Sequence, residues 1–292
     1  MDASKKARLM LISSMAIFGT LSIFVRNIPI TSGELALCRA ILAAALIGIY
    51  LLVTGQRIPF GRIKKEIPLL ILSGMAMGFN WIFLFEAYKY TTVSVATLSY
   101  YFVPVIVTVV CPILFREKMT PKQWICFGMS TLGIVLITGI GDTSGASSHI
   151  TGILFGLAAA VLYATVILLN KFIKNVGGIH RTFLQFIAAI CTLVPYILLT
   201  SGLNFSAMTG TGWDCLLIVG LFHTGITYCM YFSSLKELSG QQAAILSYID
   251  PLTAVLISVT VLGETMTPVQ IIGGILILGF TLWNELSPKK AA

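Results

Sequence analysis

Charged residues are scarce in this chain of 292 residues. Lys and Arg number 19 and Asp and Glu number 11, which makes 10% of the sequence, whereas a soluble domain carries about 25%. Apolar residues make up 57% and the mean hydropathy is +0.94. Apolar runs of roughly 20 residues, long enough to cross a bilayer as a helix, fill most of the chain. This composition excludes an ordinary soluble domain and predicts an all-α membrane protein.

The residue patterns of the common enzyme classes are also missing. There is no C-x-x-C pair and no phosphate-binding G-x-x-x-x-G-K-[ST] loop, and the histidines His149, His180 and His223 are scattered. All six cysteines fall in apolar runs, where they are expected to be small buried side chains. We therefore expect no catalytic residue, no metal site, no cofactor and no ATP hydrolysis. The net charge of +8 predicts basic cytoplasmic loops and not a nucleic-acid partner.

The hydropathy pattern predicts ten membrane-spanning helices joined by short connections. The predicted spans are 8–25, 33–53, 67–88, 92–115, 121–139, 151–170, 180–200, 212–235, 240–262 and 268–286. One connection, "GIGDTSGASSH" at 139–149, is rich in Gly and Ser and lies at the middle of the chain. It predicts a first unit of five spans at 1–140 and a second at 150–292, linked by 141–149.

The basic residues predict the orientation. With the N-terminus in the cytoplasm, only Arg26 and Lys89 of the 19 basic residues fall outside, and Arg39 lies within a span. By the positive-inside rule both termini are expected in the cytoplasm, in a bacterial inner (plasma) membrane.

Two stretches of the sequence repeat each other. "EKMTPKQW" at 117–124 and "ETMTPVQI" at 264–271 lie 147 positions apart, and the same offset relates Tyr101 to Tyr248 and Pro104 to Pro251. Since each half has an odd number of spans, the second half enters the membrane from the opposite side. This is the inverted repeat that many transporters use for alternating access. Glu117 and Glu264 are expected to anchor loops at opposite faces.

Several of these segments carry a family resemblance. "AIFGTLSIFVR" in the first span, Arg39 in the second and "SYIDPLTAVLISVTVLGETMTPVQIIGGILILG" in the last two spans resemble the drug/metabolite transporter superfamily, in its ten-helix EamA-type branch. In the first half, Val103 replaces the acid and Arg116 replaces the glycine of this pattern. The resemblance implies a carrier without ATP, a central cavity lined by spans 1–4 and 6–9, and spans 5 and 10 as an outer brace.

Ionisable and aromatic side chains inside the spans are the candidate site residues. A charge in a membrane span is expensive, so a functional role is the first hypothesis, with structural pairing an equal alternative for Arg39 and Asp250. Glu86 can pair with Lys89, three residues later. The predicted substrate-binding residues are Arg39, Asn80, Trp81, Glu86, Tyr101, His223, Tyr248 and Asp250.

These features leave three functions open. The first is a secondary active transporter that moves a small polar metabolite, an amino acid or related compound, with export favoured and protons as the candidate coupling ion. The second is uptake or efflux of an organic cation, because a carboxylate beside aromatic rings suits cation–π contact. The third is a lipid-linked sugar flippase subunit. Two halves in one chain already supply an interface, so we expect a monomer.

Overall fold

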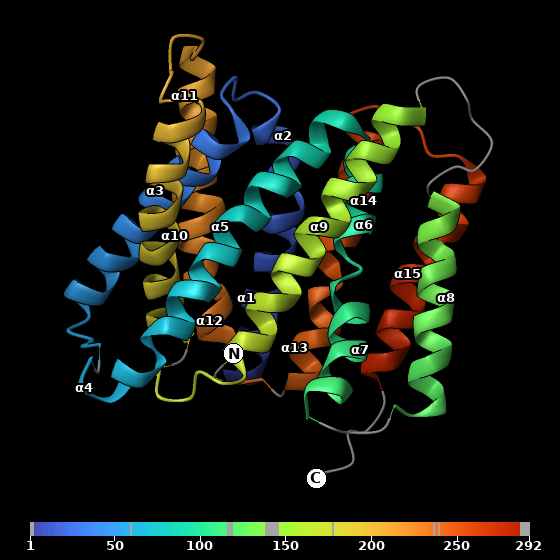
Figure 1. Ribbon diagram of the computed structural model, residues 1–292, viewed down its shortest axis with the longest axis horizontal. Helices are drawn as coiled ribbons and strands as arrows, with labels where there is room; N and C mark the ends of the chain where they lie inside the picture. Colours follow the sequence, from blue (N-terminus) through green and yellow to red (C-terminus); the bar gives the residue numbers. More distant parts are fainter. Residues whose placement is uncertain are drawn as a thin grey trace.

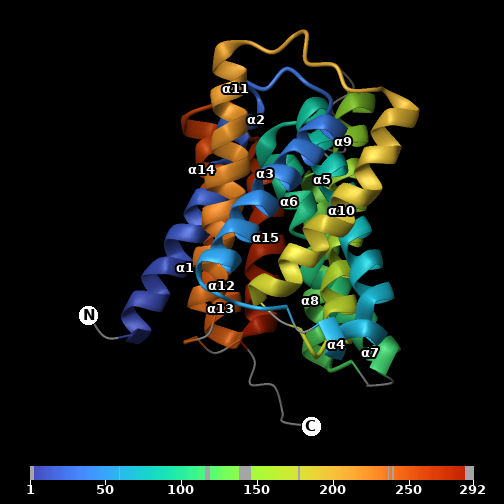
Figure 2. The ribbon, with the colours of Figure 1, turned by 90° about the vertical axis from the view of Figure 1, so that its left-hand side faces the viewer.

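The computed structural model of the chain describes residues 3–58, 60–115, 119–137, 146–176, 178–235, 237–238 and 240–286. Within these ranges every regular element is a helix, and the long helices stand side by side as a bundle (Figures 1 and 2). The predicted all-α class is confirmed.

The first half contributes spans 1 to 5. Span 1 is α1 (Ala3–Gly19) with α2 (Leu21–Val25), and span 2 is α3 (Ser32–Val53). The short α4 (Phe60–Ile63) and η1 (Lys64–Glu66) lead into span 3, which is α5 (Ile67–Tyr90). Span 4 is α6 (Val93–Tyr100) with α7 (Val103–Phe115), and span 5 is α8 (Pro121–Ile137).

The second half contributes spans 6 to 10. Span 6 is α9 (Ala146–Asn170) and span 7 is α10 (Gly178–Thr200). Span 8 is α11 (Gly210–Leu217), the π-helix η2 (Ile218–Ile226) and α12 (Thr227–Ser234). Span 9 is α13 (Gly240–Ser247) with α14 (Ile249–Thr260), and span 10 is α15 (Pro268–Glu285).

Length and composition agree with a multi-pass membrane protein. Seven helical segments in the described residues are long and apolar enough to cross a bilayer, and two shorter apolar helices lie at 245–260 and 268–284. α1 begins and α15 ends at the same end of the bundle, the lower end in Figure 1, as an even number of spans requires. We call this the N-terminal end. The prediction of ten helices in two inverted repeats is confirmed.

Two proline residues break spans 4 and 9 at equivalent places. A proline ring removes one helical hydrogen bond and clashes with the carbonyl four residues earlier. For Pro104 and Pro251 these carbonyls belong to Tyr100 and Ser247, and α6 and α13 end at those two residues. The breaks therefore follow from the repeated prolines, and they place non-helical backbone in the middle of the bundle.

The repeated "TP-x-Q" stretches start the last helix of each half. In α15, the Thr267 hydroxyl accepts from the Gln270 amide at 3.2 Å, and the Gln270 side chain accepts from the Thr267 amide at 2.9 Å. Thr120 and Gln123 make the same reciprocal pair at the start of α8, at 3.3 and 2.7 Å. These are capping boxes, which satisfy free amides at a helix start. The repetition in sequence is thus explained by helix starts on opposite faces, although Glu117 itself lies outside the described residues.

The most extensive contacts between helices are symmetric under exchange of the two halves. Span 3 packs on span 6, and its counterpart span 8 packs on span 1. In the same way, span 4 packs on span 6 and span 9 on span 1. Span 3 also packs on span 7, and span 8 packs on span 2. Spans 2 and 7 pack on each other, as do spans 5 and 10. Each of these contacts has its exchanged counterpart, as expected for two halves of one fold. The division at 141–149 stays a prediction, because 138–145 lie outside the described residues.

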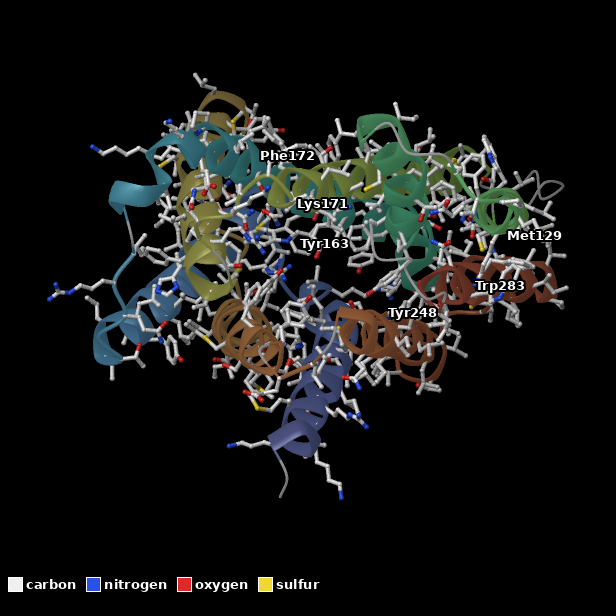
Figure 3. All side chains as sticks on the ribbon, turned by 90° about the horizontal axis from the view of Figure 1, so that it is seen from below. Met129, Tyr163, Lys171, Phe172, Tyr248 and Trp283 are labelled. Carbon is white, nitrogen blue, oxygen red and sulfur yellow. The ribbon has the colours of Figure 1, made fainter. Side chains whose placement is uncertain are left out.

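α8 and α15 form a closely packed pair at one edge of the bundle, where Figure 3 labels Met129 and Trp283. A Cβ atom built on Gly133 would lie 2.7 Å from the carbonyl oxygen of Gly273, and the reverse distance is also 2.7 Å. Only glycine permits such an approach of two backbones. The pair occupies the bracing position that the resemblance implied for spans 5 and 10.

Candidate functional site: a central cavity with one cation and one anion

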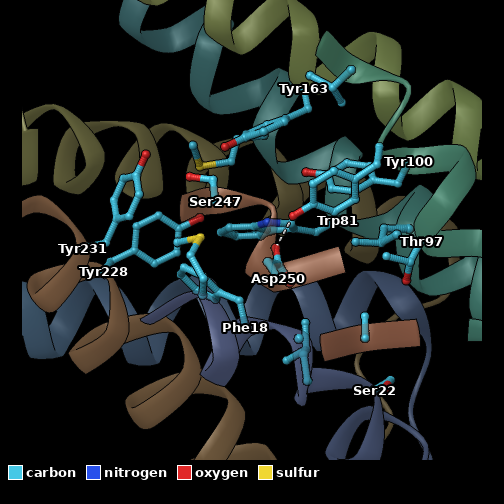
Figure 4. Close-up of a pocket in the computed structure, with 18 of the residues that line it drawn as sticks. Phe18, Ser22, Trp81, Thr97, Tyr100, Tyr163, Tyr228, Tyr231, Ser247 and Asp250 are labelled. Carbon is cyan, nitrogen blue, oxygen red and sulfur yellow. Dashed lines mark hydrogen bonds between the residues drawn. The ribbon is translucent and has the colours of Figure 1, made fainter. Parts of the chain in front are cut away.

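A cavity of about 250 Å³ lies between the two halves, beside the broken helices (Figure 4). Its lining comes from spans 1–4 of the first half and spans 6, 8 and 9 of the second. Among its described lining residues, the charged side chains are Arg39 and Asp250, and aliphatic hydroxyl groups come from Ser22, Thr97 and Ser247. The cavity thus offers two opposite charges within an otherwise aromatic and apolar wall.

Asp250 stands in the first turn of α14, directly after the break in span 9. Its Oδ2 atom accepts a hydrogen bond from the Tyr101 hydroxyl at 2.5 Å, drawn as a dashed line in Figure 4. Tyr101 follows the end of α6, so this bond joins the two equivalent breaks. Gly19 of α1 lies against this turn, where a Cβ would be 2.7 Å from the Asp250 carbonyl oxygen. The carboxylate is therefore held by both halves.

Arg39 enters the cavity from α3 and is only 4% exposed. Its Nε donates to the Thr224 hydroxyl at 2.6 Å, and its guanidinium carbon lies 4.7 Å from the Trp81 ring centre and 5.9 Å from that of Phe85. Stacking and one hydrogen bond hold a guanidinium without occupying its terminal nitrogens. The described ion pairs, Arg26–Glu264 and Lys89–Glu86, do not include Arg39.

The π-helix in span 8 places the partner of Arg39. In η2 the Thr224 hydroxyl donates to the Val219 carbonyl five residues earlier, at 2.8 Å, while it accepts from Arg39. The wider turn moves the side chains out of ordinary α-helical register, and such segments are frequent at functional sites. Arg39 of the first half is therefore oriented by an irregular turn of the second.

Aromatic side chains form most of the remaining wall. Six tyrosines line the cavity, namely Tyr88, Tyr100, Tyr101, Tyr163, Tyr228 and Tyr231. The Tyr100 and Tyr163 ring centres are 5.7 Å apart, and Phe18 meets Tyr228 edge-to-face at 5.2 Å. Rings packed this way are rigid, so they define the shape of the cavity.

The predicted site residues fall into two groups in space. Arg39, Trp81, Tyr101 and Asp250 line the cavity together. Asn80, Glu86, His223 and Tyr248 do not line it.

Asn80 and His223 instead join helices inside the bundle. The Asn80 amide donates to the Ala159 carbonyl at 2.6 Å and links α5 to α9. His223 Nε2 lies 3.0 Å from the Thr20 hydroxyl, and its ring packs against Phe24 at 4.8 Å. Both side chains are 1% exposed. These contacts tie together spans of different halves.

Glu86 and Tyr248 also lie away from the lining. Glu86 forms the expected pair with Lys89 at 2.9 Å, and both side chains are solvent-accessible, at 24% and 49% exposed. Tyr248 is buried at the break in span 9. Although it is equivalent to Tyr101 in the repeat, only Tyr101 lies in the cavity and binds Asp250. The repeat therefore fixes the position of a residue in the chain but not its contacts.

Sequence reasoning did not single out Phe18, Ser22, Thr97, Tyr231 and Ser247. Signals for two of them are present, because Ser247 lies four residues before Pro251 and Tyr231 stands one helical turn after Tyr228. The other three lie among similar small or apolar residues and carry no such mark.

A second inter-half cluster lies at the end opposite the N-terminal end. The Glu264 carboxylate, only 9% exposed, pairs with Arg26 of span 1 and accepts from the Ser258 hydroxyl. It also accepts from the Val93 amide at the start of α6, at 2.8 Å, and Ser258 is bonded to Ser94 at 2.6 Å. The predicted loop anchor therefore joins three spans of both halves.

This geometry agrees with comparisons to known proteins. The chain matches the EamA-like transporter family twice, over 5–139 and 150–284. It is 30% identical over 268 residues to the uncharacterized transporter YxxF of Bacillus subtilis, covering 91% of this chain and 85% of that one. It is 27% identical over 281 residues to an uncharacterized transporter of Archaeoglobus fulgidus, covering 94% and 95%.

A solved crystal structure supports the fold. It superposes with a TM-score of 0.64 at 17% identity, covering 95% of this chain and 96% of that chain. Ten helices in two inverted halves, a charged cavity between them and a family match to both halves lead to one conclusion: the chain belongs to the EamA-like transporter family and is a multi-pass membrane transporter.

Proposed function

We propose that this transporter carries a small zwitterionic metabolite, an α-amino acid or a close relative, and moves it unchanged by alternating access. The observation that carries the proposal is the pairing of Arg39 and Asp250 in one cavity. A ligand with one carboxylate and one ammonium group would neutralise both. A cavity of about 250 Å³ suits a ligand of this size better than a lipid-linked sugar.

Arg39 is the proposed carboxylate site. A guanidinium binds a carboxylate through two parallel hydrogen bonds, and such charge-assisted bonds are about twice as strong as neutral ones. Thr224 and Trp81 fix the orientation of the guanidinium before the ligand arrives, so less conformational freedom is lost on binding.

Asp250 is the proposed ammonium site. In the described structure its side chain has one hydrogen-bond donor, Tyr101, and a carboxylate can accept several more bonds. An uncompensated carboxylate inside a membrane bundle is unfavourable. We propose that the substrate ammonium and a proton take turns at Asp250, which would couple export of the substrate to proton entry.

Alternating access would follow from the exchange symmetry of the helix contacts. Because each half can adopt the packing of the other, opening of the N-terminal end would accompany closure of the opposite end. The Glu264 cluster would hold the opposite end closed. We also propose a monomer with both termini in the cytoplasm of the plasma membrane, on the basis of the basic residues at that end.

The organic-cation alternative has one observation in its favour, which is the tyrosine wall beside Asp250. Arg39 weighs against it, because a fixed guanidinium in the same small cavity would repel a ligand that carries only positive charge.

Transport by purified protein in proteoliposomes tests the proposal. We expect wild-type protein to exchange labelled amino acid across the membrane, and an imposed pH gradient to drive net accumulation. Arg39→Gln and Asp250→Asn should each reduce exchange at least about tenfold, since each removes a charge-assisted interaction of about 1.5–3 kcal/mol. Glu86→Gln, which changes an accessible carboxylate outside the cavity, is the matched control. Equal loss in all three variants, or none in any, would refute the assignment.

A further inference from the structure

A second pocket lies at the N-terminal end, away from the central cavity. It has a volume of about 340 Å³ and lies between the end of α3, the start of α10 and the end of α12. Its polar lining consists of Tyr50, Gln56, His180, Arg181 and Ser233. No part of the proposed transport cycle uses it.

The pocket is suited to an anion. None of its described lining residues is acidic, and the two ion pairs of the described structure do not involve Arg181. Arg181 donates from Nη1 to the Asn170 carbonyl over a long distance of 3.5 Å. The hydroxyls of Tyr50 and Ser233 can donate toward the same space. α10, a helix of 23 residues, begins in the pocket at Gly178 and adds the positive end of its dipole.

The opposite end of the bundle provides an internal comparison. A pocket of about 350 Å³ lies there between the exchanged ends of spans 2, 7 and 3. The repeat offset of 147 places Glu34 in that pocket where Arg181 stands in the first. The Glu34 carboxylate already accepts from the Thr31 amide and hydroxyl, at 2.9 and 2.8 Å, and from the Asn204 amide. The two equivalent pockets thus differ in charge, because position 181 at the N-terminal end is an arginine and its equivalent, position 34, is a glutamate.

The surroundings of this pocket indicate where the anion comes from. Ile49, Leu52 and Val53 stand on the last turns of α3, beside Tyr50, and are 62%, 83% and 82% exposed. In a membrane protein such side chains face acyl chains. Phe232 and Leu235 supply apolar lining inside the pocket itself. An anionic group next to an apolar helix surface at the end of a span is the arrangement of a phospholipid headgroup and its chains.

We propose that the pocket around Arg181 binds the phosphate of an anionic phospholipid from the leaflet at the N-terminal end. The Arg181 guanidinium and the Tyr50 and Ser233 hydroxyls bind the phosphate, and the acyl chains run along the exposed face of α3. Because α3 also carries Arg39, a lipid held there stabilises the helix that supplies one charge of the central cavity.

Native mass spectrometry of the delipidated full-length protein tests this binding. Phosphatidylglycerol and phosphatidylcholine with the same acyl chains are titrated separately, so that the two lipids share the phosphate and the chains and differ in the headgroup and its net charge. We expect phosphatidylglycerol to bind at least about tenfold more tightly, because the Arg181 guanidinium repels the quaternary ammonium of the choline headgroup and so offsets its attraction for the phosphate beside it. Arg181→Gln should remove most of this preference, and Tyr50→Phe, which keeps the charge, should weaken it about threefold.

Lys89→Gln is the matched control, because it removes one positive charge from the pocket at the opposite end. It should leave the preference unchanged. Equal binding of the two lipids, a preference that survives Arg181→Gln, or equal losses in Arg181→Gln and Lys89→Gln would each refute the proposal. Displacement of the lipid by inorganic phosphate alone would show a soluble-anion site and would also overturn it. If Arg181→Gln does not fold, the lipid preference of Tyr50→Phe decides whether this pocket is the binding site. Amino-acid exchange is measured in parallel, and its failure would not change this outcome.

Discussion

Replacing Glu264 by glutamine should loosen the end of the bundle opposite the N-terminal end. The carboxylate is 9% exposed and binds Arg26, the Ser258 hydroxyl and the Val93 amide. Glutamine keeps the shape and one acceptor oxygen but loses the charge. Arg26 is 38% exposed, so solvent screens part of that pair. The two hydrogen bonds from Ser258 and Val93 therefore account for most of the stabilisation that the substitution removes. We estimate a loss of about 2–4 kcal/mol, a factor of roughly 30 to 1000 in the opening equilibrium.

Hydrogen exchange measured by mass spectrometry reports on this opening. The Val93 amide is bonded to Glu264, so a peptide that covers the start of α6 should exchange faster in Glu264→Gln by a similar factor. The control is Glu86→Gln, which breaks an exposed pair worth about 0–1 kcal/mol. That variant should leave the same peptide nearly unchanged. Unaltered exchange at the start of α6 in Glu264→Gln would refute the assignment of Glu264 as the closing contact.

Three further predictions concern single contacts. Thr224→Val should raise the KM for exchange about tenfold without loss of folded protein, because Arg39 loses the acceptor of its Nε hydrogen bond. Proteoliposome kinetics measures the KM and a melting curve checks the folding. An unchanged KM would contradict the prediction. Asn80→Ala should lower stability by about 0.5–1.5 kcal/mol while leaving KM unchanged, because it removes the buried hydrogen bond that joins α5 to α9. A raised KM at unchanged stability would reverse that assignment. Gly133→Ala should destabilise the α8–α15 pair by about 1–3 kcal/mol. Gly128→Ala on the same helix should not, because a Cβ there meets nothing within 4 Å. Similar melting temperatures for the two variants would refute the close-packing argument.

Much of the fold was predictable because it depends on local chemistry. Apolar runs predicted the spans, and Thr-Pro-x-Gln is a pattern typical of helix starts, which the structure shows twice as capping boxes. Pro251 cannot donate a backbone hydrogen bond within span 9, and the helix breaks just before it. These features involve residues within a few positions of each other, so a single sequence contains the information.

The arrangement of the site was only partly predictable, because its contacts join distant residues. Asp250 and Tyr101 were chosen separately, and their hydrogen bond spans 149 positions. His223 was a candidate because a polar ring in an apolar run is unusual, yet its partner Thr20 lies 203 positions away, outside the cavity. Nor does the sequence signal that η2 is a π-helix and brings Thr224 to Arg39.

A set of three matched ligands tests the central claim most directly. The set is one α-amino acid, the amine left after removal of its carboxylate, and the acid left after removal of its amino group, each used to compete with labelled substrate in proteoliposome exchange. If Arg39 and Asp250 bind the two ends of a zwitterion, the intact amino acid competes and each partial ligand is weaker by at least about tenfold. Stronger competition by the amine than by the amino acid would contradict the account and favour an organic-cation transporter.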